Sequence, residues 1–300
     1  MEFNITSSIE NIFIFGAGAS VDYGLPIWRD LAHKIREKIA KDNADSYKYK
    51  KQILGWLEKI GDKKQYSTLD ECVFHESVSK DHHLDGVEVE NEVFSIIKEI
   101  FNDSYREGTL GWIRKLNDKI LDGSTPRLER SSVFVNYNYD HVLDDNFLNY
   151  EYLSAKHKRL TYKGRLAYLS TIFINTLYPH GTLFPTYEKR SSHIYKSFDT
   201  IKTGDAELLD AVSCYEGKFH KIDDSATNSP RRLYIMGLGG GLIINLGRLN
   251  FGIPISEIHV TIKDKALTSS IISFLAEKFK MTPGEIKIYN SCEDLIDACF

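Results

Sequence analysis

Ile12-Phe13-Ile14-Phe15-Gly16-Ala17-Gly18-Ala19-Ser20 is the stretch of sequence that decides the fold. Its first four residues are bulky and apolar, which predicts a short strand buried on both faces. The two glycines that follow allow the backbone to turn sharply and a bound group to approach the main chain. After Pro26, Leu31, Ile35 and Ile39 repeat at helical spacing. A strand, a glycine-rich turn and a helix in this order predict the first unit of an α/β fold.

Further strands are expected along the rest of the chain, separated mainly by helical patterns. Apolar and β-branched runs predict six strands in all, at Ile12–Phe15, Val133–Tyr137, Ile172–Tyr178, Leu233–Met236, Glu257–Ile262 and Ile286–Tyr289. Helices are expected at 242–249, along Leu267, Ile271, Leu275 and Phe279, and at 293–300. Strands joined by helical crossovers predict a Rossmann-like, mostly parallel six-stranded sheet with helices on both faces.

The block from residue 41 to residue 126 lacks the strand pattern. Ile53, Leu57 and Ile60 fit one helix, and a second is marked by Val89, Val93, Ile97 and Ile100. We therefore expect residues 1–300 to form a single Rossmann-like domain that carries a helical insertion at 41–126.

Composition and charge exclude several classes of protein. The net charge of −4 gives no reason to expect nucleic acid as the main partner, since phosphate binding needs a clustered cationic surface. The basic residues between Lys156 and Arg165 are interpreted as a solvated face. The four cysteines are scattered, which suits a reducing compartment. We find no signal-peptide pattern and no apolar run of roughly 18 residues, so a cytoplasmic protein is expected.

Polar and glycine-rich residues follow the predicted strands. These segments are Gly16–Ser20, Asn138–Asp140, His180–Gly181 and Gly237–Gly241. In an open parallel sheet, ligands bind beyond the carboxyl ends of the strands. Together the four segments therefore predict one ligand site at that edge.

The first glycine loop has two interpretations on its own. It is either a plain strand-to-helix turn or a loop that lets a phosphate approach the backbone. A dinucleotide-binding dehydrogenase would place an acidic residue about 20 residues further on, at the end of a second strand. Asp30 and Glu37 lie inside the helical pattern instead, so the ordinary dehydrogenase fingerprint is missing.

The residues after this loop resemble a known superfamily. The string Gly16-Ala17-Gly18-Ala19-Ser20, followed by Gly24-Leu25-Pro26-Ile27-Trp28-Arg29, is similar to the glycine-rich and G-I-P motifs of sirtuins. Trp28 in place of phenylalanine is more like the prokaryotic sirtuin-like NAD hydrolases of anti-phage defence. The resemblance implies that Gly16–Ser20, Pro26, Trp28 and Arg29 bind the diphosphate and ribose of NAD.

The same resemblance assigns the candidate catalytic residues. Asn138, Tyr139 and Asp140 match the Asn-Tyr-Asp of these hydrolases, with Asn136 as the rival for the asparagine role. His180, followed by Gly181, matches the catalytic histidine. The implied roles are a proton acceptor for His180, orientation of water or a ribose hydroxyl for Asn138, and binding of the nicotinamide amide or steadying of the loop for Asp140. The alternatives are an Asx-type helix cap at Asp140 and an ordinary structural histidine at 180.

The late glycine loop departs from the family. Gly237 and Gly239 correspond to a loop near the adenine ribose, where the family usually has Gly-Thr-Ser or Gly-Tyr-Ser; a tight turn or hinge is the alternative. Sirtuin deacylases also carry four zinc-binding cysteines between the histidine and this loop. Here that interval contains only Cys214, so a four-thiolate zinc site cannot form.

The implied activity is hydrolysis of NAD, as a substrate and without a metal, to nicotinamide and ADP-ribose. A role in anti-phage defence follows from the family, with a homo-oligomer, an activating protein or a phage trigger as the expected switch. His75 with Asp81-His82-His83 is not expected to bind a metal. Two alternatives stay open: an ADP-ribosyltransferase or deacylase using the same site, and a non-catalytic sensor or regulatory subunit that binds NAD or ADP-ribose.

Overall fold

A computed structural model describes residues 11–42, 46–61, 65–66, 69–77, 83–105, 111–121, 132–140, 142–143, 176–177, 231–239, 242–243, 246–247 and 255–300. Its strands are β1 (Asn11–Phe15), β2 (Ser132–Asn136), β3 (Thr176–Leu177), β4 (Arg232–Met236), β5 (Glu257–Thr261) and β6 (Ile286–Tyr289). Its α-helices are α1 (Trp28–Lys41), α2 (Lys50–Glu58), α3 (Leu69–Ser77), α4 (His83–Ser104), α5 (Trp112–Leu121), α11 (Thr268–Phe279) and α12 (Cys292–Cys299). Short 3-10 helices lie at η1 (Ala17–Tyr23), η4 (Lys265–Leu267) and η5 (Pro283–Glu285).

All described strand pairs are parallel, and the strand order is β3-β2-β1-β4-β5-β6. β1 lies in the middle, with Phe15 opposite both Asn136 of β2 and Met236 of β4. From β1 the strands β2 and β3 follow on one side, and the chain then returns to place β4 on the other side of β1. The pair β1 and β4 is therefore the switch point, where ligands bind in Rossmann-like sheets. The predicted α/β class with a parallel sheet is confirmed.

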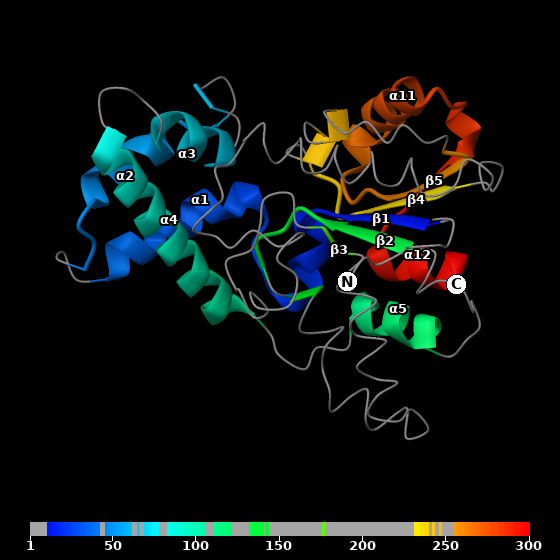
Figure 1. The fold of residues 1–300 in the computed structure, drawn as a ribbon, viewed down its shortest axis with the longest axis horizontal. Coiled ribbons are helices and arrows are strands. Elements are labelled where there is room, and N and C mark those ends of the chain that lie inside the picture. Colours follow the sequence, from blue (N-terminus) through cyan, green and yellow to red (C-terminus); the bar gives the residue numbers. More distant parts are fainter. Residues whose placement is uncertain are drawn as a thin grey trace, which may run out of the picture.

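The central strand is buried on both sides, as its apolar run predicted. Alternate residues of a strand point to opposite faces. Phe13 and Phe15 accordingly belong to one hydrophobic cluster, which also contains residues of α1, α4, α5 and α12. Ile12 and Ile14 belong to a second cluster, to which α11 contributes Ile271 and Leu275. Figure 1 shows the strands running between α11 and the pair formed by α5 and α12.

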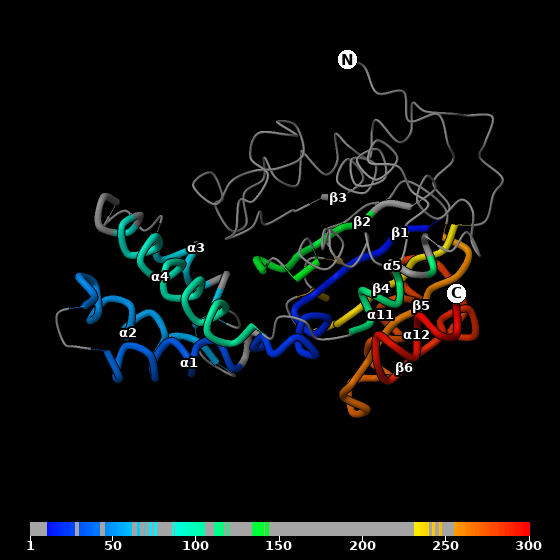
Figure 2. The backbone as a smooth tube through the Cα atoms, turned by 90° about the horizontal axis from the view of Figure 1, so that it is seen from below, coloured from blue at the N-terminus to red at the C-terminus, as the bar shows by residue number. Residues whose placement is uncertain are grey.

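The helices α1–α4 form a group beside the strands (Figures 1 and 2). Leu31, Ile35 and Ile39 of α1 are all buried, as their spacing predicted. The predicted face of α4, formed by Val89, Val93, Ile97 and Ile100, is buried as well. On the surface, Lys38 of α1 forms ion pairs with Glu99 (3.0 Å) and Asp103 (3.5 Å) of α4.

Two details of the predicted helices were wrong. Ile60 lies after the end of α2 and forms an isolated bridge with Tyr66, because the chain leaves the helix at Lys59. Leu267 is exposed and lies in η4, because α11 begins one residue later. Residues 242, 243, 246 and 247 are helical, in agreement with the expected helix at 242–249. Most of the predicted strand Ile172–Tyr178 lies outside the described residues, which include only Thr176 and Leu177.

The helix α5 ties the carboxyl-terminal helix to the segment after β1. The ring of Trp112, at the start of α5, stacks on Phe15 at a centroid distance of 5.4 Å, and its Nε1–H donates to the carbonyl of Ala19 at 2.8 Å. The hydroxyl of Tyr23 accepts a hydrogen bond from the backbone N–H of Ile113 at 3.1 Å. At the surface, Lys115 of α5 pairs with Glu293 and with Asp297 (2.9 Å) of α12.

No helix in the described part of the chain is both long and apolar enough to cross a membrane.

Trp112→Phe should lower the free energy of unfolding by about 1–3 kcal/mol, because the buried carbonyl of Ala19 loses its donor while the aromatic contact with Phe15 is kept. Urea denaturation would measure the change. Lys115→Ala, in the same helix, serves as the control and should cause no measurable change, because its ion pairs are exposed to solvent. Equal stabilities of wild type and Trp112→Phe would contradict the role given to the indole N–H.

Candidate functional site

The two glycine loops meet at the carboxyl ends of β1 and β4. The backbone N–H of Gly16 donates to the carbonyl of Met236, the last residue of β4 (2.9 Å). A Cβ atom added to Gly18 would lie 2.9 Å from the Cα of Gly237, and one added to Gly237 would lie 2.0 Å from the backbone nitrogen of Ala19. Real Cβ atoms do not approach other atoms so closely, so the loops pack backbone against backbone. This backbone contact explains why Gly18 and Gly237 are glycines, and no ligand is needed to explain them.

Gly237 has a second reason to be glycine. Its φ angle is +74°, in the left-handed region that other residues rarely adopt. Its N–H donates to the hydroxyl of Thr261, at the end of β5, over 2.7 Å. Gly239 differs, because it is exposed and a Cβ added there would meet no atom of the described residues within 4 Å. Of the two candidate glycines in this loop, only Gly237 is required by the packing.

The segment after Gly16 is a 3-10 helix, η1, rather than an open loop. It runs from Ala17 to Tyr23 and is capped by Gly24, which adopts a left-handed φ of 89°. Ala19 and Ser20 are buried, Ala17 is partly exposed and Gly18 is exposed. A ligand at this edge could therefore reach the backbone of Ala17 and Gly18 most directly.

Asn138 joins the end of β2 to the glycine loop. Its Nδ2 donates to the carbonyl of Gly16 (3.1 Å) and to the hydroxyl of Ser20 (3.1 Å). Because a carbonyl oxygen can only accept, the bond to Gly16 fixes which end of the amide faces the loop. Asn138 is only 6% exposed, and among the described residues its Oδ1 has no hydrogen-bond partner.

Asn136 leaves a complementary group unpaired. Its Oδ1 accepts the backbone N–H of Asn138 at 3.0 Å, which fixes the orientation of this amide too. The side chain is 1% exposed, and its Nδ2 has no partner within the part of the chain that the structure describes. An unpaired buried polar atom costs about 1–3 kcal/mol, so such atoms indicate a missing partner such as a ligand or an ordered water. The end of β2 thus offers one free acceptor and one free donor.

Asp140 forms an Asx-type helix cap, which is the alternative to binding a substrate. Its Oδ1 accepts the backbone N–H of Val142 at 3.0 Å, as in an Asx turn that starts a helix. Residues 142 and 143 are helical. A contact with a substrate is not needed to explain this carboxylate, although capping leaves such a contact open.

The remaining candidates are described only in part. Pro26 leads into α1, which begins at Trp28 and continues through Arg29, but the side chains of Trp28 and Arg29 lie outside the described residues. His180 and Gly181 also lie outside them. The strand that precedes them is described: β3 pairs with β2, with Thr176 opposite Phe134 and Leu177 opposite Val135.

Sequence reasoning missed two residues that hold this edge together, Thr261 and Trp112. Thr261 is a polar residue at the end of β5, and its position there is a signal that could have identified it. Trp112 stands in the block interpreted as an insertion, where nothing local indicates a contact with Ala19. Cys292 approaches the hydroxyl of Thr261 at 3.9 Å, and burial raises its pKa to about 12, so this thiol stays protonated. The described residues include no group of three histidine, cysteine or acidic side chains that could hold a metal ion.

No protein-family model matches the chain, and no curated protein matches it either. The resemblance to sirtuin-like NAD hydrolases therefore rests on the short motifs alone.

Gly237→Ala should lower the free energy of unfolding by about 2 kcal/mol or more, because a side chain at φ +74° is strained and its Cβ would overlap the backbone of Ala19. Gly239→Ala is the matched control in the same loop and should stay within about 0.5 kcal/mol of wild type. Thermal or urea unfolding would compare the two. The packing interpretation fails if both substitutions cost the same.

Proposed function

We propose that this protein is an NAD glycohydrolase, which cleaves the bond between nicotinamide and ribose. The observation that carries the proposal is the buried amide of Asn138, whose NH₂ group donates to the glycine loop while its Oδ1 lacks a partner among the residues that the structure describes. A water molecule or a ribose hydroxyl is a donor that would satisfy this oxygen. The resemblance of Gly16–Arg29, Asn138–Asp140 and His180–Gly181 to sirtuin-like NAD hydrolases selects NAD among nucleotides.

The reaction needs few groups from the protein. The C–N glycosidic bond breaks, and its electron pair moves to the ring nitrogen of the positively charged nicotinamide. Water attacks the resulting oxocarbenium-like carbon and loses a proton, so NAD⁺ and water yield nicotinamide, ADP-ribose and H⁺. In the proposal His180 accepts that proton, since a histidine titrates near neutral pH. Asn138 holds the water or a ribose hydroxyl in line for the attack.

The other residues bind the substrate in this proposal. Gly16–Ser20, together with Pro26, Trp28 and Arg29, binds the diphosphate and one ribose. Gly237 and Gly239 lie near the adenine ribose, and Asp140 binds the nicotinamide amide or steadies its loop. The full architecture proposed is a six-stranded Rossmann-like sheet with helices on both faces and a helical insertion at 41–126. In the same proposal the protein lies in the cytoplasm and acts in anti-phage defence. Formation of a homo-oligomer, a partner protein or a phage trigger activates it.

Two other functions would use the same edge. A transferase would move ADP-ribose from NAD to a protein, whereas a residual deacylase would move an acyl group from a protein lysine to the ADP-ribose of NAD. A sensor or regulatory subunit would bind NAD without turnover, and the unpaired atoms of Asn136 and Asn138 fit binding as well as catalysis.

Incubation of the purified protein with NAD should release nicotinamide and ADP-ribose in equal amounts, measured by chromatography in each assembly state. His180→Ala and Asn138→Ala should each lower kcat by roughly a hundred-fold, as expected for loss of a proton acceptor or of a group that positions the nucleophile. Asn136→Ala tests the rival asparagine and should keep more activity than Asn138→Ala.

Binding must be measured with the same variants. NAD should still raise the melting temperature of His180→Ala, because a catalytic residue can be removed without loss of the binding loop. Tight binding with no turnover by wild type, in every assembly state and with every activator tried, would favour the sensor. Label transferred from NAD to protein would favour the transferase, and equal turnover in wild type and all variants would refute the site assignment.

A further inference from the structure

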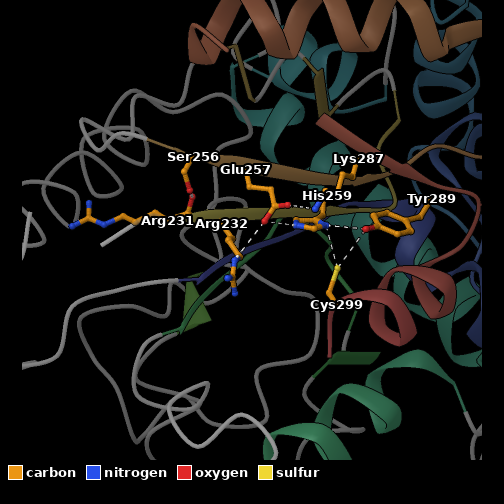
Figure 3. Close-up of polar contacts among 8 residues, drawn as sticks. All are labelled: Arg231, Arg232, Ser256, Glu257, His259, Lys287, Tyr289 and Cys299. Carbon is orange, nitrogen blue, oxygen red and sulfur yellow. Dashed lines mark hydrogen bonds and ion pairs between the residues drawn. The ribbon is translucent and has the colours of Figure 1, made fainter. Parts of the chain in front are cut away.

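A second cluster of reactive side chains lies near the opposite edge of the sheet, and the proposed function does not use it. Its members are Glu257 and His259 of β5, Tyr289 of β6 and Cys299 of α12 (Figure 3). Glu257 and His259 are the first and third residues of β5, and Tyr289 ends β6. None of these four residues belongs to the candidate site, which lies at the ends of β1, β2 and β4.

The cysteine faces a nitrogen of the buried imidazole. The Sγ atom of Cys299 lies 3.1 Å from Nδ1 of His259, and the hydroxyl of Tyr289 lies 3.0 Å from the same nitrogen. His259 is only 4% exposed, with its ring stacked on that of Tyr234 at a centroid distance of 4.9 Å. Cys299 is partly exposed, whereas the other described cysteines, Cys72 and Cys292, are buried.

A carboxylate stands on the other side of the imidazole. Nε2 of His259 lies 3.2 Å from Oε2 of Glu257, although it lacks the alignment of a hydrogen bond. The hydrogen bond from Lys287, and then the contact with His259, lower the pKa of Glu257, so this group is a carboxylate at neutral pH. The negative charge favours the tautomer with its proton on Nε2, which leaves the lone pair of Nδ1 facing both the Cys299 thiol and the Tyr289 hydroxyl.

In the resting state the thiol of Cys299 and the imidazole of His259 are both uncharged. Burial lowers the pKa of His259, and burial raises the pKa of Cys299. Lys287 and Arg232, which surround Glu257, further disfavour a charged imidazolium. A thiolate is therefore not preformed, and the thiol proton can leave only as the sulfur bonds to an electrophile.

We propose that Cys299 is a modification site for small, uncharged α,β-unsaturated carbonyl compounds, with His259 as the base that takes the thiol proton. In this addition the sulfur bonds to the β-carbon, and the electrons of the C=C bond move toward the carbonyl. His259 Nδ1 accepts the proton from sulfur and returns it to the α-carbon. No group leaves and no oxidant is needed, so the reaction requires only the electrophile.

N-Ethylmaleimide is a suitable probe for the full-length native protein, with the labelling rate of each cysteine followed by peptide mass spectrometry. Cys299 should be labelled while Cys72 and Cys292, which are buried, stay protected. His259→Gln should slow the labelling of Cys299 by roughly ten-fold or more. Glu257→Gln should slow it less, since the imidazole remains but its tautomer is no longer fixed. Ser256→Ala, which alters only a contact with the carbonyl of Arg231, should leave the rate unchanged.

Misfolding would speed the labelling, because an opened structure exposes Cys72 and Cys292 together with Cys299, and these three cysteines would then all react faster. If His259→Gln behaves in this way, Glu257→Gln becomes the deciding variant. An unlabelled Cys299 in the native wild type would overturn the proposal. So would a wild-type labelling rate in both His259→Gln and Glu257→Gln while Cys72 and Cys292 stay protected.

Discussion

The contact between Gly237 and the loop that begins at Gly16 is the constraint on which the carboxyl edge of the sheet depends. The two backbones approach so closely that a single added carbon at Gly237 would lie 2.0 Å from the nitrogen of Ala19. Three side chains from distant parts of the sequence then hold these loops: Asn138 at Gly16, Trp112 at Ala19 and Thr261 at Gly237. Fixing the loops in this way costs chain entropy, and the buried hydrogen bonds help to offset that cost.

This packing limits the chemistry that the edge can perform. Most polar groups there already bond one another, including the hydroxyls of Ser20 and Thr261 and one oxygen of Asp140. What remains on Asn138 and Asn136 is an uncharged acceptor and an uncharged donor, both buried. Such groups suit the orientation of water or hydroxyls better than the binding of a charged phosphate, for which the backbone of Ala17 and Gly18 is closer to solvent.

The same parallel sheet supports a different kind of cluster on β5 and β6. There the polar groups are titratable and charged, with Glu257 between His259, Lys287 and Arg232. α12 carries Cys299 into this cluster, while its exposed side contacts α5 through Lys115. α5 in turn holds the loop after β1, so this pair of helices contacts both the loop after β1 and the cluster around His259.

The sequence by itself determined the α/β class and most of the strands and helices, because runs of buried residues and helical spacing are local properties. It also indicated that Asn138 and Gly237 stand where strands end. Only the tertiary structure decided what these residues do. The need for glycine at 237 arises from Ala19, more than two hundred residues earlier, and the free oxygen of Asn138 exists because Gly16 occupies the other end of its amide. Contacts between residues so far apart in the chain leave no periodic pattern, so the partners of Trp112, Thr261 and Cys299 could not be predicted from the sequence.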